Sequence, residues 1–143
     1  MSPEIARFTM DPYLEEVRHK LIEAQFSLQP LQAPDPKNFG NWILIGARDN
    51  LVLRVTNDRG DILLDVMPSH LFAIGPNESD WFNYDIVARA LGIYLWPKEN
   101  VMRSFLHHFW MIDEKFSPHK WDKTAAILAT VEEEKRRRVS VHT

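Results

Sequence analysis

The sequence predicts an α+β fold in which one helix leads into an antiparallel sheet and three helices follow. Hydrophobic residues recur at helical spacing near the N-terminus and in the second half of the chain, but alternate with a period of two between residues 42 and 66. The order lacks the strand-helix-strand alternation that indicates a parallel sheet. We therefore expect an antiparallel meander of three or four strands, with the three C-terminal helices packed on one of its faces.

The whole chain, residues 1–143, is expected to form a single domain. Its length suits one hydrophobic core, and its 45% hydrophobic and 26% charged residues are typical of a globular protein. We find no internal repeat in the sequence, and we expect residues 1–10 and 139–143 to fray at the two ends.

The first helix is predicted from Pro12 to Phe26. Asp11 suits its N-cap because a carboxylate accepts hydrogen bonds from free amides, and proline is tolerated at the first helical position. One face carries an apolar stripe formed by Leu14, Val17, Leu21 and Ala24. The segment from Ser27 to Asn38 contains three prolines, so we expect a non-helical connection there.

Three strands are predicted at Trp42 to Ile45, Leu51 to Thr56 and Ile62 to Val66, which are rich in β-branched and aliphatic residues. The two short separators, residues 47–50 and 57–60, consist mostly of residues that tolerate turns. Consecutive antiparallel hairpins follow from this pattern.

The middle strand is expected to have one buried and one partly wet face. Leu53 and Val55 alternate with Arg54 and Thr56, which is the pattern of an antiparallel sheet covered by helices on one side. At the second turn we expect Gly60 to adopt a positive φ, because glycine has no Cβ to oppose it.

The segment after the third strand leaves one alternative open. Leu71, Phe72 and Ile74 alternate well enough to predict a fourth short strand, although the surrounding residues are typical of a loop. The second helix is then predicted to start at a cap formed by Asn83 or Ser79 and to end at Gly92.

Two more helices complete the prediction. The third starts at Pro97 and directs four apolar side chains inward, namely Val101, Phe105, Phe109 and Ile112. The last runs from about Pro118, after Ser117, to Arg138, and buries Trp121, Ala125, Leu128 and Val131. Glutamates at 132, 133 and 134 each precede an arginine by four residues, which favours ion pairs along the helix.

Composition excludes several classes of protein. The chain has no cysteine, which removes disulfide scaffolds and thiolate sites and favours a cytoplasmic location. We find no signal-peptide pattern and no apolar run of membrane-spanning length, so we expect no membrane insertion. The net charge is −3 despite a basic run at residues 135–138, so nucleic acid is not expected to be the main partner.

The sequence shows no assembled catalytic or metal site. His107 and His108 are adjacent, so on a helix they point about 100° apart and do not chelate one ion. Asp58 falls in a predicted turn, and Asp61 and Asp65 lie roughly 13 Å apart along a strand. Without a serine elbow or phosphate-binding glycine loop, we expect no enzyme activity, no metal and no cofactor.

The most informative segment runs from Asp80 to Asp85, where three aromatic rings stand beside carboxylates. We expect at least two of the rings to pack on the core, with an acidic rim left for a basic protein partner. The predicted partner-binding set consists of Asp58, Asp61, Glu78, Asp80, Trp81, Phe82 and Asp85.

Three stretches carry a resemblance to a known group of proteins. The first is Phe39-Gly40-Asn41. The second runs from Leu53 to Val66 and consists of a strand, an Asp-Arg-Gly turn and another strand. The third runs from Trp81 to Asp85, and all three lie within Phe39 to Leu91. Phe116-Ser117-Pro118 adds a looser similarity. Together they resemble small uncharacterised bacterial proteins, some of which look like immunity proteins of polymorphic or contact-dependent toxin systems. The resemblance implies toxin neutralisation by direct binding and carries no catalytic residues.

Our leading hypothesis is thus a non-catalytic, cytoplasmic protein-binding domain, of the kind that an immunity protein provides. The alternative is a small-molecule-binding or enzyme-accessory domain with a pocket between sheet and helices. A homo-oligomeric scaffold is the third hypothesis.

Overall fold

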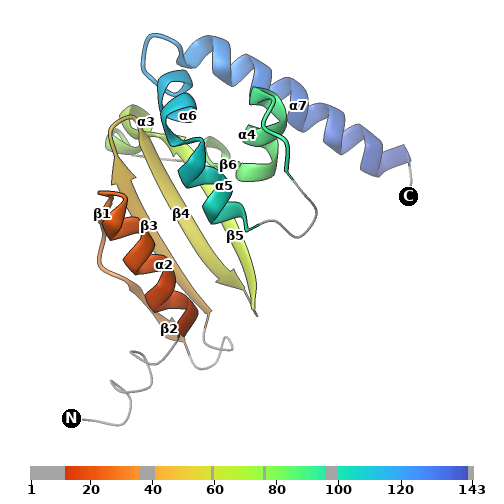
Figure 1. Cartoon of the computed structure of the whole chain (residues 1–143). Coiled ribbons are helices and arrows are strands. Elements are labelled where there is room, and N and C mark those ends of the chain that lie inside the picture. Colours follow the sequence, from red (N-terminus) through yellow and green to blue (C-terminus); the bar gives the residue numbers. More distant parts are fainter. Residues whose placement is uncertain (1–11, 36–40, 59, 76, 96–99, 142–143) are drawn as a thin grey trace, which may run out of the picture.

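Three long antiparallel strands form the centre of the structure, as the alternating sequence predicts (Figure 1). They are β3 (Asn41–Arg48), β4 (Leu51–Asp58) and β5 (Asp61–Pro68). The computed structural model describes residues 12–35, 41–58, 60–75, 77–95 and 100–141. Because α2 (Pro12–Glu23) precedes these strands and helices follow them, the predicted α+β class is confirmed.

The sheet is wider than the predicted meander, since short strands extend both of its edges to six strands in all. β1 (Ser27–Leu28) and β2 (Gln32–Asp35) both pair with β3, and β6 (Phe82–Asn83) pairs with β5. The expected count of three or four strands was too low. Edge strands present unpaired backbone groups, and the proline-containing connection after α2 satisfies those of β3.

Pairing registers divide the sheet into two faces. The inner face, which packs against helices, includes Leu44 of β3, Val55 of β4 and Leu64 of β5, all buried and in register. The outer face carries the alternate residues of the same strands: Ile43, Ile45, Val52, Arg54, Thr56, Leu63, Asp65 and Met67. The prediction that Leu53 and Val55 lie on the buried face is therefore confirmed.

Helices cover the inner face, as the sequence predicts. Figure 1 shows α2, α5 (Val101–His107) and α6 (Phe109–Lys115) in front of the sheet, with α4 (Tyr84–Leu91) and α7 (Trp121–Val141) beside them. Their apolar side chains join those of the strands in one core cluster. Edge-to-face aromatic pairs fill its centre, with Phe105 contacting Phe109 and Tyr84.

The predicted fourth strand at Leu71 to Ile74 was wrong, because this segment forms the short helix α3 (Ser69–Ala73). The β3–β4 turn determines the start of this helix. Ser69 donates from its amide to the Asn50 carbonyl over 2.8 Å and from its hydroxyl to the Asp49 carbonyl over 2.9 Å. Short apolar runs do not distinguish strand from helix by periodicity, and here tertiary contacts decide.

Several helix limits also differ from the predictions. The first helix stops at Glu23 rather than Phe26, since Gln25 adopts a left-handed φ of 68°. The predicted third helix is two helices, α5 and α6, separated at His108, so four helices of the described chain follow the sheet where three were expected. Its predicted start, Pro97, lies outside the described residues, and Asn100 caps α5 instead.

The second and last helices complete this comparison. Of the two predicted caps, Asn83 and Ser79, it is Asn83 that caps α4, and Gly92 ends this helix with a φ of 74° as predicted. α7 begins at Trp121 rather than Pro118, and the Ser117 hydroxyl donates to the Glu114 carbonyl of α6. α7 runs to Val141, and two of the expected ion pairs form, Glu132 with Arg136 and Glu133 with Arg137. Residues 1–11, including Asp11, and residues 142–143 lie outside the described residues.

The two faces predict opposite outcomes for the same substitution in adjacent residues of β5. Leu64→Asp places an unpaired carboxylate in the core, where Leu64 is 2% exposed, and should cost more than about 4 kcal/mol. Leu63→Asp changes a side chain that is 44% exposed on the outer face, and should cost less than about 1 kcal/mol. Denaturant unfolding of both variants measures this; equal losses would contradict the assigned faces.

The β4–β5 turn gives a second prediction. Gly60 has a φ of 90°, as the sequence predicts, and nothing lies within 4 Å of the position that a Cβ would occupy. Gly60→Val should therefore lower stability by about 1–2 kcal/mol through backbone strain rather than a clash. Gly60→Asn, which accepts positive φ more readily, should cost less; a thermal midpoint that is equally low for both variants would argue against conformational strain.

Candidate partner-binding surface

An ion pair across two strands forms the centre of the outer face. Arg54 of β4 stands directly opposite Asp65 of β5, and its Nη2 lies 3.0 Å from the Asp65 carboxylate. Its Nε donates to the same oxygen over 3.3 Å. The two side chains are only 18% and 16% exposed, so the pair is largely removed from water. Asp65 on the neighbouring strand thus fixes the orientation of the Arg54 guanidinium.

The segment before β6 closes over this guanidinium. Glu78, in the 3-10 turn η2 (Glu78–Asp80), accepts from both terminal nitrogens of Arg54 at 2.8 and 3.1 Å. The ring of Trp81 stacks on the guanidinium, 4.5 Å from its carbon, and meets the edge of Phe72 of α3. We call Arg54, Asp65, Glu78 and Trp81 the Arg54 cluster.

Charge interactions within the cluster shift two pKa values. Hydrogen bonds to Glu78 raise the pKa of Arg54, against the opposing effect of its partial burial, and Asp65 adds to the increase. In return, the hydrogen bond and the positive charge of Arg54 hold the pKa of Glu78 below its ordinary value. A bidentate guanidinium–carboxylate pair of this kind has a well-defined geometry.

The hairpin aspartates lie on the same face as the Arg54 cluster. Asp58 and Asp61 pair across the β4–β5 turn, both are exposed, and their positions alternate in phase with Arg54 and Asp65. Four residues along β4 separate Asp58 from Arg54, which corresponds to about 13 Å. Among the described residues of this part of the face, the carboxylates of Asp58, Asp61, Asp65 and Glu78 outnumber the single guanidinium of Arg54, so it is acidic.

Apolar side chains continue the surface between these charges. Leu63 is 44% exposed on β5, and Ile43 and Ile45 are half-buried on β3. Figure 1 shows the longer helices gathered on the other side of the sheet. The outer face therefore combines exposed apolar area with an organised polar cluster.

Two residues of the predicted set serve the fold itself. Asp80 accepts a hydrogen bond from the Asn77 amide over 2.9 Å and completes a capping box for η2. Phe82 pairs with Val66 of the inner face and meets the ring of Trp121 edge-on. With Tyr84 also buried, at least two rings of this segment pack on the core as predicted, and Trp81 is the ring left on the outer face.

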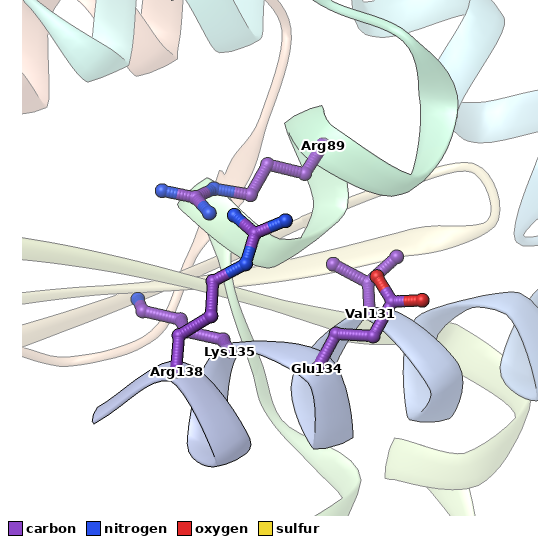
Figure 2. A pocket seen from close by; sticks show the side chains of 5 residues that line it. All are labelled: Arg89, Val131, Glu134, Lys135 and Arg138. Atoms are coloured by element: carbon purple, nitrogen blue, oxygen red, sulfur yellow. The ribbon is translucent and has the colours of Figure 1, made fainter. Parts of the chain in front are cut away.

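Asp85 lies away from the other predicted residues, in the first turn of α4. Its carboxylate contacts Arg89 at 3.2 Å and Lys135 of α7 at 3.1 Å. Partial burial opposes ionisation, but Lys135 and Arg89 prevail and lower the pKa of Asp85. The adjacent pocket has a volume of about 330 Å³. Figure 2 shows Arg89, Lys135 and Arg138 beside it, with Glu134 and Val131 completing its lining. Asp85 therefore links α4 to α7 and is not part of the acidic face.

The predicted set omitted Arg54 and Asp65, although the sequence contained a signal for them. A two-residue turn that pairs Asp58 with Asp61 places residue 54 opposite residue 65 by simple counting. Opposite charges at directly facing positions are a recognised stabilising pair in antiparallel sheets. The roles of Glu78 and Trp81 had no such signal, because a loop brings them onto the sheet from outside the hairpin.

Comparison of the chain with protein-family models, curated proteins and solved structures found no match. None of the three comparisons bears on the resemblance to immunity proteins that is expected from the sequence. Within the described ranges, no helix combines the length and hydrophobicity needed to cross a bilayer. Among the same residues, no three His, Asp or Glu side chains are grouped as they would be around a metal ion.

The pKa of Glu78 gives a direct test of the Arg54 cluster. Arg54→Gln should raise this pKa toward its ordinary value of 4.5, as measured by carbon-detected NMR titration of the Glu78 carboxyl group. Because the folded-state pKa is lowered, the contribution to stability is present above the unfolded-state pKa. It is lost as pH falls through the folded-state value.

A control variant isolates the pair. Arg89→Gln removes a guanidinium that contacts Asp85 and should leave the Glu78 titration unchanged. If Glu78 titrates identically with and without the Arg54→Gln substitution, the bidentate pair does not persist in solution.

Proposed function

We propose that this protein is a non-catalytic binding domain that recognises a basic protein partner through the outer face of its sheet. The observation that carries the proposal is the Arg54 cluster, in which an arginine and a tryptophan are held ready on a face with exposed apolar side chains. Arg and Trp are among the residue types that most often dominate the energy of protein interfaces.

Preorganisation supports this assignment. Binding costs less entropy when the contacting side chains are already ordered, and Arg54 is held by Asp65, Glu78 and the Trp81 ring before any partner arrives. The exposed Leu63 lies on the strand that also supplies Asp65, so an apolar contact and an ordered polar contact are close neighbours. Both are features of the centre of an interface.

The carboxylates exposed on the outer face support a basic partner. The exposed carboxylates of Asp58 and Asp61 extend the acidic surface to the tip of the β4–β5 hairpin. Complementary charge mainly accelerates encounter and excludes partners of like charge. A basic protein domain is the partner that this arrangement favours.

We further propose that the partner is a toxin domain and that the protein acts as a cytoplasmic immunity protein, covering the active site of the toxin. This step rests on the sequence resemblance of Phe39 to Leu91, together with a surface suited to complementarity rather than chemistry. The alternative of a pocket between sheet and helices is less well supported, because the inner face is filled by interlocking rings such as Phe26, Phe105 and Phe109.

The test begins with the genes that flank the gene of this protein: a toxin-like product encoded there is co-expressed with the chain, followed by pull-down, association kinetics and a survival assay. Asp58→Lys/Asp61→Lys should slow association by about tenfold or more at low salt and weaken its salt dependence, without unfolding the chain. Asp80 is left intact, because its substitution would disrupt the η2 cap.

A matched control makes the same change of charge elsewhere. Glu15→Lys/Glu23→Lys alters two exposed carboxylates on α2 and should leave association unchanged. Full protection and unchanged kinetics in the hairpin variant would place the interface elsewhere. Self-association of the free chain that the hairpin variant abolishes would instead indicate a homo-oligomeric role for this face.

A further inference from the structure

A second surface lies among the helices, where α4, α6 and α7 meet. They enclose an open groove of about 540 Å³, within the size range of pockets that bind small molecules. Its lining comprises Ala90, Leu91, Met111, Lys115, His119, Lys120, Lys123, Thr124 and Ile127. Since the helices cover the inner side of the sheet, this groove is separate from the outer face.

Apolar side chains provide one part of this lining. Leu91 and Ala90 come from the end of α4, Met111 from α6, and Ile127 from α7. Ile127 is 41% exposed although it stands one residue before the fully buried Leu128. An apolar body that enters the groove would remove this exposed surface from water, which is favourable in proportion to the area covered.

Basic side chains provide the other part, and no acidic residue belongs to the lining. Lys120 already contacts the Glu114 carboxylate, so its charge is partly compensated. Lys115 also interacts electrostatically with Glu114 but forms no ion pair at contact distance with a described residue, nor does Lys123, and His119 adds another polar group. α7, a helix of 21 residues, also begins at Trp121 between Lys120 and Lys123, so its positive N-terminal end adds to the same potential.

We propose that this groove binds a small amphipathic anion, with its carboxylate near Lys115 and Lys123 and its aliphatic or aromatic body against Leu91, Met111 and Ile127. Met111 stands one helical turn before Lys115 on α6 and Ile127 one turn after Lys123 on α7, so the apolar and basic lining residues are displaced along both helices as the two parts of such a ligand require. The pocket in Figure 2 lacks this arrangement. Its cations Arg89 and Lys135 already share the Asp85 carboxylate, and Glu134 belongs to its lining.

Three probes of equal chain length test the proposal: octanoate, octylammonium and octan-1-ol, each used well below its micelle-forming concentration. In ¹⁵N-resolved NMR titrations, octanoate should shift the amides of residues 90–91, 111–115 and 119–127 and should bind at least about tenfold more tightly than octan-1-ol, because charge-assisted contacts add to apolar burial. Octylammonium should not compete with octanoate.

Variants separate the two parts of the site. Lys115→Gln/Lys123→Gln should weaken octanoate binding by about tenfold or more while sparing octan-1-ol, whereas Ile127→Asp should weaken both. Arg103→Gln, an exposed cation on α5, is the control and should change neither affinity. Circular dichroism confirms that each variant is folded.

Two outcomes would overturn the proposal. One is octanoate binding that persists in the double lysine variant, and the other is a set of shifted amides that maps outside α4, α6 and α7. Binding of octylammonium as strong as that of octanoate would likewise show that charge does not select the ligand. None of these results bears on the outer face, so the proposed protein partner is tested independently.

Discussion

The alternation of side chains along β4 is the constraint on which the rest of the molecule depends. Leu53 and Val55 are fully buried beneath the helices, while Arg54 between them faces the opposite side of the sheet. A slip of one residue in the pairing would exchange the faces and bury the guanidinium in the core. The register that builds the core thus also positions the Arg54 cluster, so stability and the candidate surface have one origin.

Polar contacts at the β3–β4 turn join the helical layer to the sheet. Asn50 donates from its amide to the buried carboxylate of Asp113 in α6 over 2.8 Å. Arg48 donates to the Ala24 carbonyl at the end of α2 and lies 4.5 Å from the centre of the Phe109 ring. Apolar packing alone is not directional, whereas these hydrogen bonds allow few orientations of α2 and α6. The long helices are thus held on the inner face, and the outer face keeps exposed positions such as Leu63 while Val52 and Met67 at its other end are buried.

The two candidate surfaces differ in charge and in position. The outer face is acidic around Asp58 and Asp61, and the groove among the helices is basic around Lys115 and Lys123. Since the sheet and its core lie between them, a ligand in the groove and a partner on the outer face need not exclude each other. The net charge of −3 gives no indication of this separation, because it depends only on the number of charges and not on their positions.

The sequence alone determined the α+β class, the three central strands, their buried face and the end of α4, because periodicity, turn residues and capping act over a few neighbouring positions. The Arg54–Asp65 pair could also be predicted from the sequence, because the hairpin register places these two residues opposite each other. Only the tertiary structure decided that Leu71 to Ala73 is helical, that β1, β2 and β6 extend the sheet, and that Phe82 and Asp85 lie outside the acidic surface. These outcomes depend on contacts between distant segments, which local patterns do not encode.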